Sequence, residues 1–327
     1  MSDMTYRPLG TSGLMSSVIG LGCNAFGSRI DAEQTQRVVD AALDAGITLF
    51  DTADTYGRGV SEELLGKALG SQRDEVVLAT KFGMDMEGRN GPDWGARASR
   101  RYVRTAVEAS LTRLGTDHID LYQLHQPDLV TPIEETLEAM TELVTEGKVR
   151  YIGCSNFAAW EVVDAHWTAA SGGLQPFITA QNEYSLYNRS AEEELVPACE
   201  RLGISILPYF PLAYGLLTGK YRRGEAAPSG SRLERQSARL ENADFDRIEA
   251  LEAFAAERGI GILDVALGGL AAQPAVGSVI AGATRPEQVR GNVAAGLWEP
   301  SPDDLAALDS INTERATGMT HTSFTRG

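Results

Sequence analysis

The stretch Val76-Val77-Leu78-Ala79-Thr80-Lys81 is a run of mostly apolar residues that ends in a charged side chain. Two other stretches share this arrangement, Ile47-Thr48-Leu49-Phe50-Asp51 and Ile119-Asp120-Leu121-Tyr122-Gln123-Leu124-His125. β-branched and aromatic residues are enriched in strands, and short apolar runs are typical of strands buried on both faces. The three stretches therefore predict strands at 47–50, 76–80 and 119–124, each followed by a polar residue.

Strand and helix patterns alternate along almost the whole chain, which is typical of parallel strands joined by helical crossovers. A polar, turn-rich opening predicts a short β-hairpin within residues 1–17. The predicted strands cover residues 18–22, 47–50, 76–80, 119–124, 149–153, 177–180, 204–208 and 276–280. The predicted helices cover residues 32–45, 61–69, 99–114, 132–146, 158–170, 191–202, 244–258, 262–272 and 286–295. Eight such units without a break in composition favour an α/β fold of one closed (β/α)8 TIM barrel, with residues 1–327 as a single domain.

The charge and cysteine content limit the partners that the chain can have. Its 327 residues carry a formal net charge of -16, which argues against nucleic acid as a partner because such binding needs a basic face. The three cysteines are scattered and odd in number, as expected in a reducing compartment. No apolar run is long enough to span a membrane, and no amino-terminal apolar stretch follows a basic region, so we expect no secretory leader. We expect a soluble cytoplasmic protein; the oligomeric state stays open.

Four polar residues at or near the strand ends form a candidate catalytic set: Asp51, Tyr56, Lys81 and His125. The carboxyl ends of parallel barrel strands meet at one face, where active sites are built. A carbonyl that accepts hydride needs a proton, and tyrosine is a reluctant acid unless a nearby ammonium favours its phenolate. Lys81 is the candidate ammonium, Asp51 its counter-ion, and His125 a neutral donor that orients the carbonyl oxygen.

Each of these residues also has an ordinary structural interpretation. Asp51 is in a position to cap the next helix, and Tyr56 to pack in a turn. Lys81 alone resembles a solvated charge at a strand end, and a lone His125 is more often a satisfied core histidine. These alternatives weaken because all four residues lie at successive strand ends, which independent accidents would seldom produce.

The motifs around these residues resemble a known family. Asp51-Thr52-Ala53-Asp54-Thr55-Tyr56-Gly57, Thr80-Lys81-Phe82 and the stretch 119–125 are similar to the signatures of the aldo-keto reductases, in the same order. The resemblance covers nearly the whole chain. It implies a (β/α)8 barrel that uses NADPH to reduce aldehydes and ketones, with Tyr56 as general acid, Lys81 and Asp51 tuning it, and His125 positioning the carbonyl.

The same resemblance implies a cofactor site. Ser155, Asn156 and Gln181 are similar to the residues that read the nicotinamide carboxamide, and Tyr209 to the residue that stacks on the ring. Ser155 and Asn156 are also candidates for capping the following helix. A glycine-punctuated loop with Pro211, Leu212, Gly215 and Lys220 resembles the loop that folds over the pyrophosphate, and residues 213–242 are expected to cover the cofactor. The alternative for this segment is a mobile surface loop.

The stretch from Gly282 to Asn292 opens a helix after the last strand, and a helix amino terminus with a basic side chain suits a phosphate. By resemblance, Arg285 and Gln288 contact the adenosine 2′-phosphate and Asn292 the adenine, with Gly282 and Thr284 alongside. Relatives carry lysine and glutamate where this chain has Gly282 and Gly291, so NADH stays an alternative cofactor. An arginine without a ligand is the other interpretation of Arg285.

The apolar part of a substrate pocket is expected to include Phe26, Trp94 and Tyr214. The substrate class is a small carbonyl compound, and its identity and the direction of the reaction stay open. Gly20-Leu21-Gly22-Cys23-Asn24-Ala25 matches a dinucleotide-binding pattern, but a Rossmann fold would leave Lys81 and His125 without a role. The histidines lack the spacing of a metal site, so no metal is expected.

A second function from another class is a regulatory subunit that binds NADPH and turns over slowly, as in the channel β-subunits that resemble this family. We expect an enzyme rather than such a regulatory subunit, because the set of four polar residues is intact and we expect no amino-terminal extension.

Overall fold

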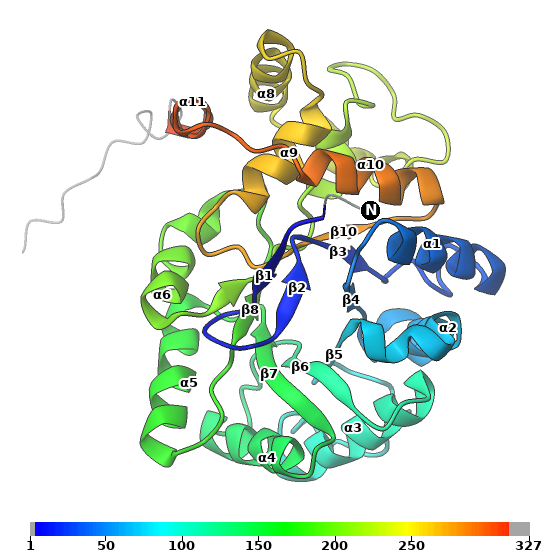
Figure 1. Cartoon of the computed structure of the whole chain (residues 1–327), viewed down its shortest axis with the longest axis vertical. Helices are drawn as coiled ribbons and strands as arrows, with labels where there is room; N and C mark the ends of the chain where they lie inside the picture. The colour runs from blue at the N-terminus through cyan, green and yellow to red at the C-terminus, as the bar shows by residue number, and fades with distance from the viewer. Residues whose placement is uncertain (1–3, 314–327) are drawn as a thin grey trace, which may run out of the picture.

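The computed structural model describes residues 4–313 and contains eight parallel strands arranged as a barrel (Figure 1). The first seven strands pair in parallel with their neighbours along the chain, and the last strand returns to pair with the first. Bonds between Ile206 and residues 275 and 277 join β9 to the segment that leads into β10. The strands are β3 (Ile19–Gly22), β4 (Leu49–Asp51), β5 (Val77–Phe82), β6 (Ile119–Leu124), β7 (Val149–Ser155), β8 (Thr179–Gln181), β9 (Ser205–Ile206) and β10 (Val279–Gly282). The predicted (β/α)8 barrel is confirmed.

Helices surround the strands, as Figure 1 shows. The predicted helices correspond to α1 (Ala32–Asp44), α2 (Val60–Leu69), α3 (Arg100–Leu114), α4 (Ile133–Thr145), α5 (Ala159–Gly172), α6 (Leu195–Leu202), α8 (Phe245–Glu257), α9 (Ile262–Ala271) and α10 (Pro286–Gly296). The largest difference is at α6, where residues 190–192 form a separate 3-10 turn (η3, Ser190–Glu192). Two further helices were not predicted, the short α7 (Ser237–Glu241) and α11 (Pro302–Thr313).

Local signals explain where α1 and α3 begin and end. The Asp31 side chain accepts the amide of Gln34 before α1, and the Ser99 side chain accepts the amide of Tyr102 at the start of α3. Such caps satisfy amides that have no partner within the helix. Gly115 ends α3 with a φ of 66°, a left-handed conformation that glycine adopts without the cost of a Cβ atom.

The predicted amino-terminal hairpin is present as β1 (Tyr6–Pro8) and β2 (Met15–Ser17), which pair antiparallel. Leu9 and Leu14 in its turn pack on apolar side chains inside the barrel, including Leu49, Val77 and Leu121. The hairpin therefore closes one end of the barrel and leaves the carboxyl ends of the strands for a site. Residues 1–3 and 314–327 of the predicted domain lie outside the described residues.

Several strands continue past the ends of the apolar runs that predicted them. Asp51, Lys81 and Gln181 were expected just after strands, and each lies within one, whereas His125 directly follows β6 as predicted. Backbone pairing continues past the apolar residues, since the Asp51 carbonyl accepts the Cys23 amide at 2.8 Å. On β5, Val77 and Ala79 belong to the cluster inside the barrel, so the strand alternation brings Lys81 to the interior as well. The interior is therefore apolar at one end and polar at the carboxyl end.

No helix within residues 4–313 is both long and apolar enough to cross a membrane.

Candidate active site

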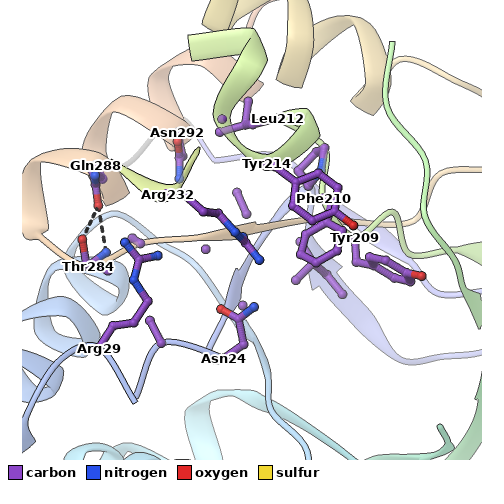
Figure 2. Close-up of a pocket in the computed structure, with 18 of the residues that line it drawn as sticks. Asn24, Arg29, Tyr209, Phe210, Leu212, Tyr214, Arg232, Thr284, Gln288 and Asn292 are labelled. Atoms are coloured by element: carbon purple, nitrogen blue, oxygen red, sulfur yellow. Dashed lines mark hydrogen bonds between the residues drawn. The ribbon is translucent and has the colours of Figure 1, made fainter. Parts of the chain in front are cut away.

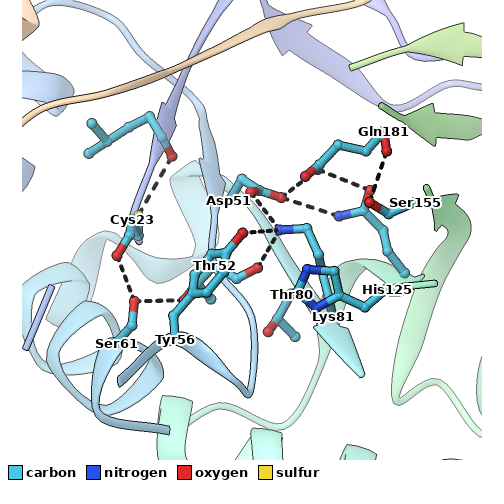
Figure 3. A network of polar contacts seen from close by, with 12 residues as sticks. Cys23, Asp51, Thr52, Tyr56, Ser61, Thr80, Lys81, His125, Ser155 and Gln181 are labelled. Carbon is cyan, nitrogen blue, oxygen red and sulfur yellow. Dashed lines mark hydrogen bonds and ion pairs between the residues drawn. The ribbon is translucent and has the colours of Figure 1, made fainter. Parts of the chain in front are cut away.

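The four predicted catalytic residues meet at the carboxyl end of the barrel (Figure 3). The Lys81 Nζ atom donates to the Asp51 carboxylate at 2.7 Å, to the Thr52 carbonyl at 2.8 Å and to the Tyr56 hydroxyl at 3.4 Å. The Tyr56 and His125 rings lie edge to face with centroids 5.9 Å apart. A phenol, an ammonium, a carboxylate and an imidazole are thus in contact around one point.

A second set of polar contacts holds Asp51 in place. Its Oδ1 atom accepts the side-chain amides of Gln181 at 2.9 Å and Gln123 at 3.2 Å, while Oδ2 accepts Lys81. Asp51 does not cap a helix, since Gly59 precedes α2, and Lys81 is not solvated, with an exposed fraction of 0%. Because both oxygens of the carboxylate accept hydrogen bonds, the ion pair is fixed rather than free to rotate away.

The environment determines the charge of each group. Burial raises the pKa of Tyr56 above its usual 10, and the opposing attraction of Lys81 only partly offsets this. Lys81 therefore acts in the expected direction, but burial outweighs it. Burial on its own would lower the pKa of Lys81, but Asp51, Tyr56 and their hydrogen bonds together raise it. Burial and then the Lys81 charge lower the pKa of His125 to about 3. At neutral pH the site holds a neutral phenol, a charged ammonium and a neutral imidazole.

A cavity of about 1110 Å³ opens from this polar end and extends over the ends of the strands. Asp51, Tyr56 and His125 line its base, with Lys81 buried behind them. The residues expected at the cofactor site also line it: Ser155, Asn156, Gln181, Tyr209, Pro211, Leu212, Gly215, Lys220, Gly282, Thr284, Arg285, Gln288 and Asn292. The structure thus brings the sequence-predicted catalytic and cofactor residues to one cavity.

Several of these side chains already have partners within the chain. Asn156 donates to the His125 carbonyl at 2.9 Å and accepts the Tyr209 hydroxyl at 2.7 Å. Thr284 donates through its amide and its hydroxyl to Gln288, at 2.8 and 3.0 Å. Ser155 and Asn156 do not cap α5, because Ala158 occupies that position. Asn156 has a φ of 61°, a left-handed conformation in which asparagine is enriched.

The cavity is basic although the chain is acidic. Arg29, Lys220, Arg232 and Arg285 line it, and within residues 4–313 none of these four forms an ion pair. In Figure 2 the Arg29 and Arg232 side chains reach into the same space. Burial and then repulsion from Arg29 lower the pKa of Arg232. Glu287 is the acidic exception on this part of the wall. Cations that face one another without a counter-ion indicate a site for an anionic ligand.

The segment at 210–215 is strained where it borders the cavity. Phe210, Ala213 and Tyr214 have φ values of 53°, 46° and 61°, a region that such residues seldom adopt. Arg232 lies over the Phe210 ring at 4.8 Å, and Arg239 lies over the Tyr214 ring at 3.6 Å. These cation–π contacts connect Arg232 and Arg239 to the strained residues that border the cavity. Residues 213–242 contain two 3-10 turns (η4, Ala213–Thr218, and η5, Arg232–Arg235) besides α7.

Two of the aromatic residues expected in the substrate pocket lie elsewhere. Phe26 has an exposed fraction of 0% and belongs to the main hydrophobic core, because its loop turns inward beneath α2. Trp94 has an exposed fraction of 78% and stacks on Arg101 at 4.3 Å, away from the cavity lining. Tyr214, the third, does line the cavity. Aromatic character in a loop did not reveal whether the ring faces core, solvent or cavity.

The sequence analysis missed Arg29, Arg232 and Phe210 on the cavity wall. Arg29 follows the first barrel strand, four residues after the stretch 20–25 that matched a dinucleotide-binding pattern, and no motif included it. Arg232 lies in the segment 213–242 that was expected to cover the cofactor, and the Gly, Pro, Ser and Arg content of that segment was the only available signal. Phe210 directly follows Tyr209, at the end of the segment after β9.

Comparison with known proteins identifies the family of this chain. Residues 18–313 match the aldo/keto reductase family. The chain belongs to this family. Its relatives include the uncharacterized oxidoreductase YrpG of Bacillus subtilis (strain 168), 38% identical over 316 residues that cover 94% of this chain and 96% of the relative.

Two further relatives of this aldo/keto reductase differ in their described roles. Versiconal hemiacetal acetate reductase of Aspergillus parasiticus is 33% identical, covering 96% of this chain and 98% of the relative. A probable voltage-gated potassium channel subunit beta of Arabidopsis thaliana is 35% identical, covering 89% of this chain and 91% of the relative. The family thus includes proteins named for reduction and proteins named for association with a channel.

Proposed function

We propose that this aldo/keto reductase catalyses the NADPH-dependent reduction of aldehydes or ketones, or the reverse oxidation, with Tyr56 as the general acid. The observation that carries the proposal is the Tyr56 hydroxyl at 3.4 Å from the Lys81 Nζ atom, at the base of a cavity of about 1110 Å³. A nicotinamide cofactor, when bound, supplies the hydride. The chain's own residues must then supply a proton and orient the carbonyl.

We call Asp51, Tyr56, Lys81 and His125 the tetrad. Its charge states suit the transfer of a proton to a carbonyl oxygen. Tyr56 keeps its proton at neutral pH because burial holds its pKa above 10. As negative charge develops on the substrate oxygen, the proton moves from the Tyr56 hydroxyl to that oxygen, and the phenolate left behind is stabilised by the ammonium of Lys81. His125 is neutral, so it can donate one hydrogen bond to the carbonyl oxygen without competing as an acid.

The cavity fits an anionic dinucleotide. Arg29, Lys220, Arg232 and Arg285 lack ion-pair partners within residues 4–313, so an anionic group would relieve the repulsion between Arg29 and Arg232. We propose that Ser155, Asn156 and Gln181 hold the carboxamide and that Tyr209 stacks on the ring. Pro211, Leu212, Gly215 and Lys220 lie along the pyrophosphate in this proposal, and Gly282, Thr284, Arg285, Gln288 and Asn292 surround the adenosine end.

A preference for NADPH over NADH is part of the proposal. The 2′-phosphate adds charge only to the phosphorylated cofactor, and Arg285 precedes the amino terminus of α10, where its guanidinium and the helix dipole act together. NADH stays the alternative cofactor. All three cysteines are free and buried, and we propose a reducing, cytoplasmic location on that basis.

The decisive experiment follows cofactor oxidation with a panel of aldehydes and ketones, NADPH and NADH in parallel. Tyr56→Phe should lower kcat by roughly a hundredfold to ten-thousandfold, the usual contribution of a general acid, with cofactor affinity unchanged. Tyr6→Phe is the matched control, because that hydroxyl lies on the amino-terminal hairpin and donates to the Gly46 carbonyl. Equal turnover by wild type and Tyr56→Phe would remove Tyr56 from the mechanism.

The named channel relatives favour a second candidate. A regulatory subunit of this fold would bind NADPH and contact a partner while turning over slowly. Steady consumption of NADPH over many turnovers, without loss of rate, would exclude such a one-shot sensor. A single equivalent oxidised per chain would favour it.

A further inference from the structure

A second buried polar cluster lies on the outer side of the strands that carry the tetrad. We call it the outer cluster: Asp54, Glu62, Thr80, Asn90, Arg113 and Tyr122. It lies between β5 and β6 on one side and α2 and α3 on the other. Thr80 and Lys81 are neighbours on β5 and so point to opposite faces, Lys81 towards the tetrad and Thr80 into this cluster. The mechanism proposed above uses none of its side chains.

The hydrogen bonds within the outer cluster are short, and most of its polar side-chain atoms have a partner. Glu62 accepts the Thr80 hydroxyl at 2.6 Å and the Arg113 Nε atom at 2.6 Å. Asn90 joins the two halves, because it accepts Arg113 at 2.9 Å and donates to the Asp54 Oδ2 atom at 2.9 Å. The exceptions are the Asp54 Oδ1 atom and the Tyr122 hydroxyl, which are buried and have no hydrogen-bond partner within residues 4–313.

The charges of the cluster balance only if one carboxyl group is neutral. Asp54 and Glu62 both have exposed fractions of 0%, and the guanidinium of Arg113 is the cation in contact with the cluster. Arg113 pairs with Glu62 and does not bond to Asp54. A second ionised carboxylate would therefore be buried without a cation, at a cost that proteins avoid by keeping the proton. Asp54 is the carboxyl group without a partner charge.

The electrostatics of Asp54 agree with that geometry. Burial and then the Glu62 charge raise its pKa to about 8, against the opposing effects of Arg113 and of the bond from Asn90. The groups that face it are Glu62 on α2, Tyr102 and Arg113 on α3, Tyr122 on β6, and Asn90 in the loop before α3. Burial raises the pKa of Tyr102 to about 12 and that of Tyr122 well above its usual value, so neither titrates near Asp54.

Asp54 lies in the short loop that sets the position of Tyr56. Its backbone amide donates to the Lys81 carbonyl at 3.1 Å, and the Tyr56 amide donates to the Ala53 carbonyl at 3.2 Å. Lys81 in turn bonds the Thr52 carbonyl on the other side. A displacement of the Asp54 side chain therefore moves the loop against β5 and changes the contact between Tyr56 and Lys81.

We propose that Asp54 is a positioning residue, a carboxylic acid that keeps its proton at neutral pH and so holds the Tyr56 loop against the Lys81 strand. The proposal rests on the proposed role of Tyr56. When Asp54 ionises, the new buried charge repels Glu62, the loop loosens, and Tyr56 loses its alignment. An alkaline decrease of kcat near pH 8 then belongs to Asp54. Tyr56, Lys81 and His125 do not titrate there, since the pKa values of Tyr56 and Lys81 are raised above their usual 10 and 10.5 and that of His125 is lowered to about 3.

The test compares the pH dependence of kcat in wild type, Asp54→Asn and Asp74→Asn. Asparagine keeps the shape and the Asn90 bond but cannot ionise, so Asp54→Asn should lack the decrease near pH 8 while wild type shows it. Asp74 is an exposed aspartate and serves as the control with the same change of charge. KM for the cofactor should stay the same in all three. The same decrease in Asp54→Asn would overturn the proposal.

Two readouts do not need activity, so they separate this proposal from the function of the site. The infrared carbonyl band of a protonated carboxyl group should be present at pH 6, fade through pH 8, and be missing in Asp54→Asn. The ¹³C NMR signal of the Tyr56 ring, assigned with Tyr56→Phe, should shift through pH 8 in wild type and not in Asp54→Asn. The inference is overturned if wild type lacks the infrared band, or if the Tyr56 signal shifts in the same way in wild type and Asp54→Asn, even when carbonyl reduction is confirmed. If both the band and the Tyr56 shift behave as expected but the protein does not reduce carbonyls, only the proposed function is refuted.

Glu62→Gln provides a second variant if Asp54→Asn does not fold. Removing the Glu62 charge leaves Arg113 free to attract Asp54, so the infrared transition and the decrease of kcat should both move to lower pH. Transitions that stay near pH 8 in Glu62→Gln would contradict the assignment to Asp54.

Discussion

Replacing Asp51 by asparagine isolates the contribution of the buried ion pair. Asp51 and Lys81 have side-chain exposed fractions of 3% and 0%, and their charged atoms lie 2.7 Å apart. Asparagine preserves an acceptor for Gln181 and Gln123 but removes the negative charge. The Lys81 ammonium is then buried with only the Thr52 carbonyl and the Tyr56 hydroxyl as partners.

The expected loss of unfolding free energy at pH 7 is about 3–5 kcal/mol, the range for removing one partner of a buried pair. The lysine itself sets an upper limit. It can fold neutral, and pH 7 is 3.5 pH units below its ordinary pKa of 10.5. At about 1.36 kcal/mol per unit, neutralisation costs roughly 4.8 kcal/mol. The two figures agree, so most of the loss should appear as a lowered pKa of Lys81 in the variant.

The loss should therefore depend on pH with a definite sign. In wild type the folded pKa of Lys81 lies above 10.5, so the stability from its charge is complete below that pH and is lost only above it. In the variant only the weaker effect of Tyr56 opposes burial, and we expect the folded pKa of Lys81 to fall below 10.5. The unfolding free energy of the variant then rises between that lowered pKa and 10.5. The difference in unfolding free energy between wild type and Asp51→Asn should therefore become smaller from pH 7 to pH 10.

Urea denaturation at several pH values, followed by circular dichroism, measures this gap. Glu87→Gln is the control, since the Arg58–Glu87 pair at 2.6 Å has side chains 56% and 57% exposed. A pair exposed to this extent contributes only about 0.2–1 kcal/mol. A gap below about 1 kcal/mol for Asp51→Asn, or one that widens with pH, would refute the account of Lys81 as a charge held by Asp51.

Three further outcomes follow from the same geometry. First, because His125 has a pKa of about 3, kcat/KM should show no decrease from its protonation between pH 5 and 7, and such a decrease abolished in His125→Gln would contradict its neutral role. Second, Arg285→Ala should weaken binding of NADPH by about tenfold to a hundredfold and of NADH far less, as fluorescence titration can measure, whereas Arg232→Ala should weaken both. Equal losses of affinity for NADPH and NADH in Arg285→Ala would contradict a contact between Arg285 and the 2′-phosphate. Third, Gly66→Ala should destabilise the fold by about 1–3 kcal/mol, because a Cβ atom there would lie 2.1 Å from the Leu114 carbonyl oxygen. Gly13→Ala, with 3.8 Å to its nearest neighbour, should leave the melting temperature unchanged.

The fold was predictable because the barrel strands are mostly buried on both faces and therefore contain runs of apolar residues. The prediction matches β6 (Ile119–Leu124) at both ends, but it ends one residue early at β4 and two residues early at β5. A strand whose interior side chains turn polar still pairs through its backbone, so the last apolar residue does not mark the end of the strand. Helix α11 was missed because a helix that packs outside the barrel, against α8, has no place in the repeat of strand and helix.

The candidate site was predictable to the extent that it is built from strand ends. Barrel geometry alone places Asp51, Lys81 and His125 at one face once their strands are known. Loop residues have no such constraint. Phe26 and Trp94 come from comparable loops, yet one lies in the core and the other in solvent. Arg29 and Arg232 come from segments more than two hundred residues apart, and only the folded chain brings them to one cavity wall.

Strand β5 joins the candidate active site on its interior face to the outer cluster on its other face. Its interior face ends in Lys81, which is held by Asp51, and its outer face carries Thr80, which is held by Glu62. The loop from Thr52 to Tyr56 bonds to the same strand through the Lys81 Nζ atom and through the Lys81 carbonyl. A change of charge on either face therefore reaches the Tyr56 hydroxyl through one rigid backbone. Asp51→Asn and Asp54→Asn should for this reason respond differently to alkaline pH: the loss of unfolding free energy in Asp51→Asn should shrink towards pH 10, whereas Asp54→Asn cannot ionise and should keep its kcat through pH 8.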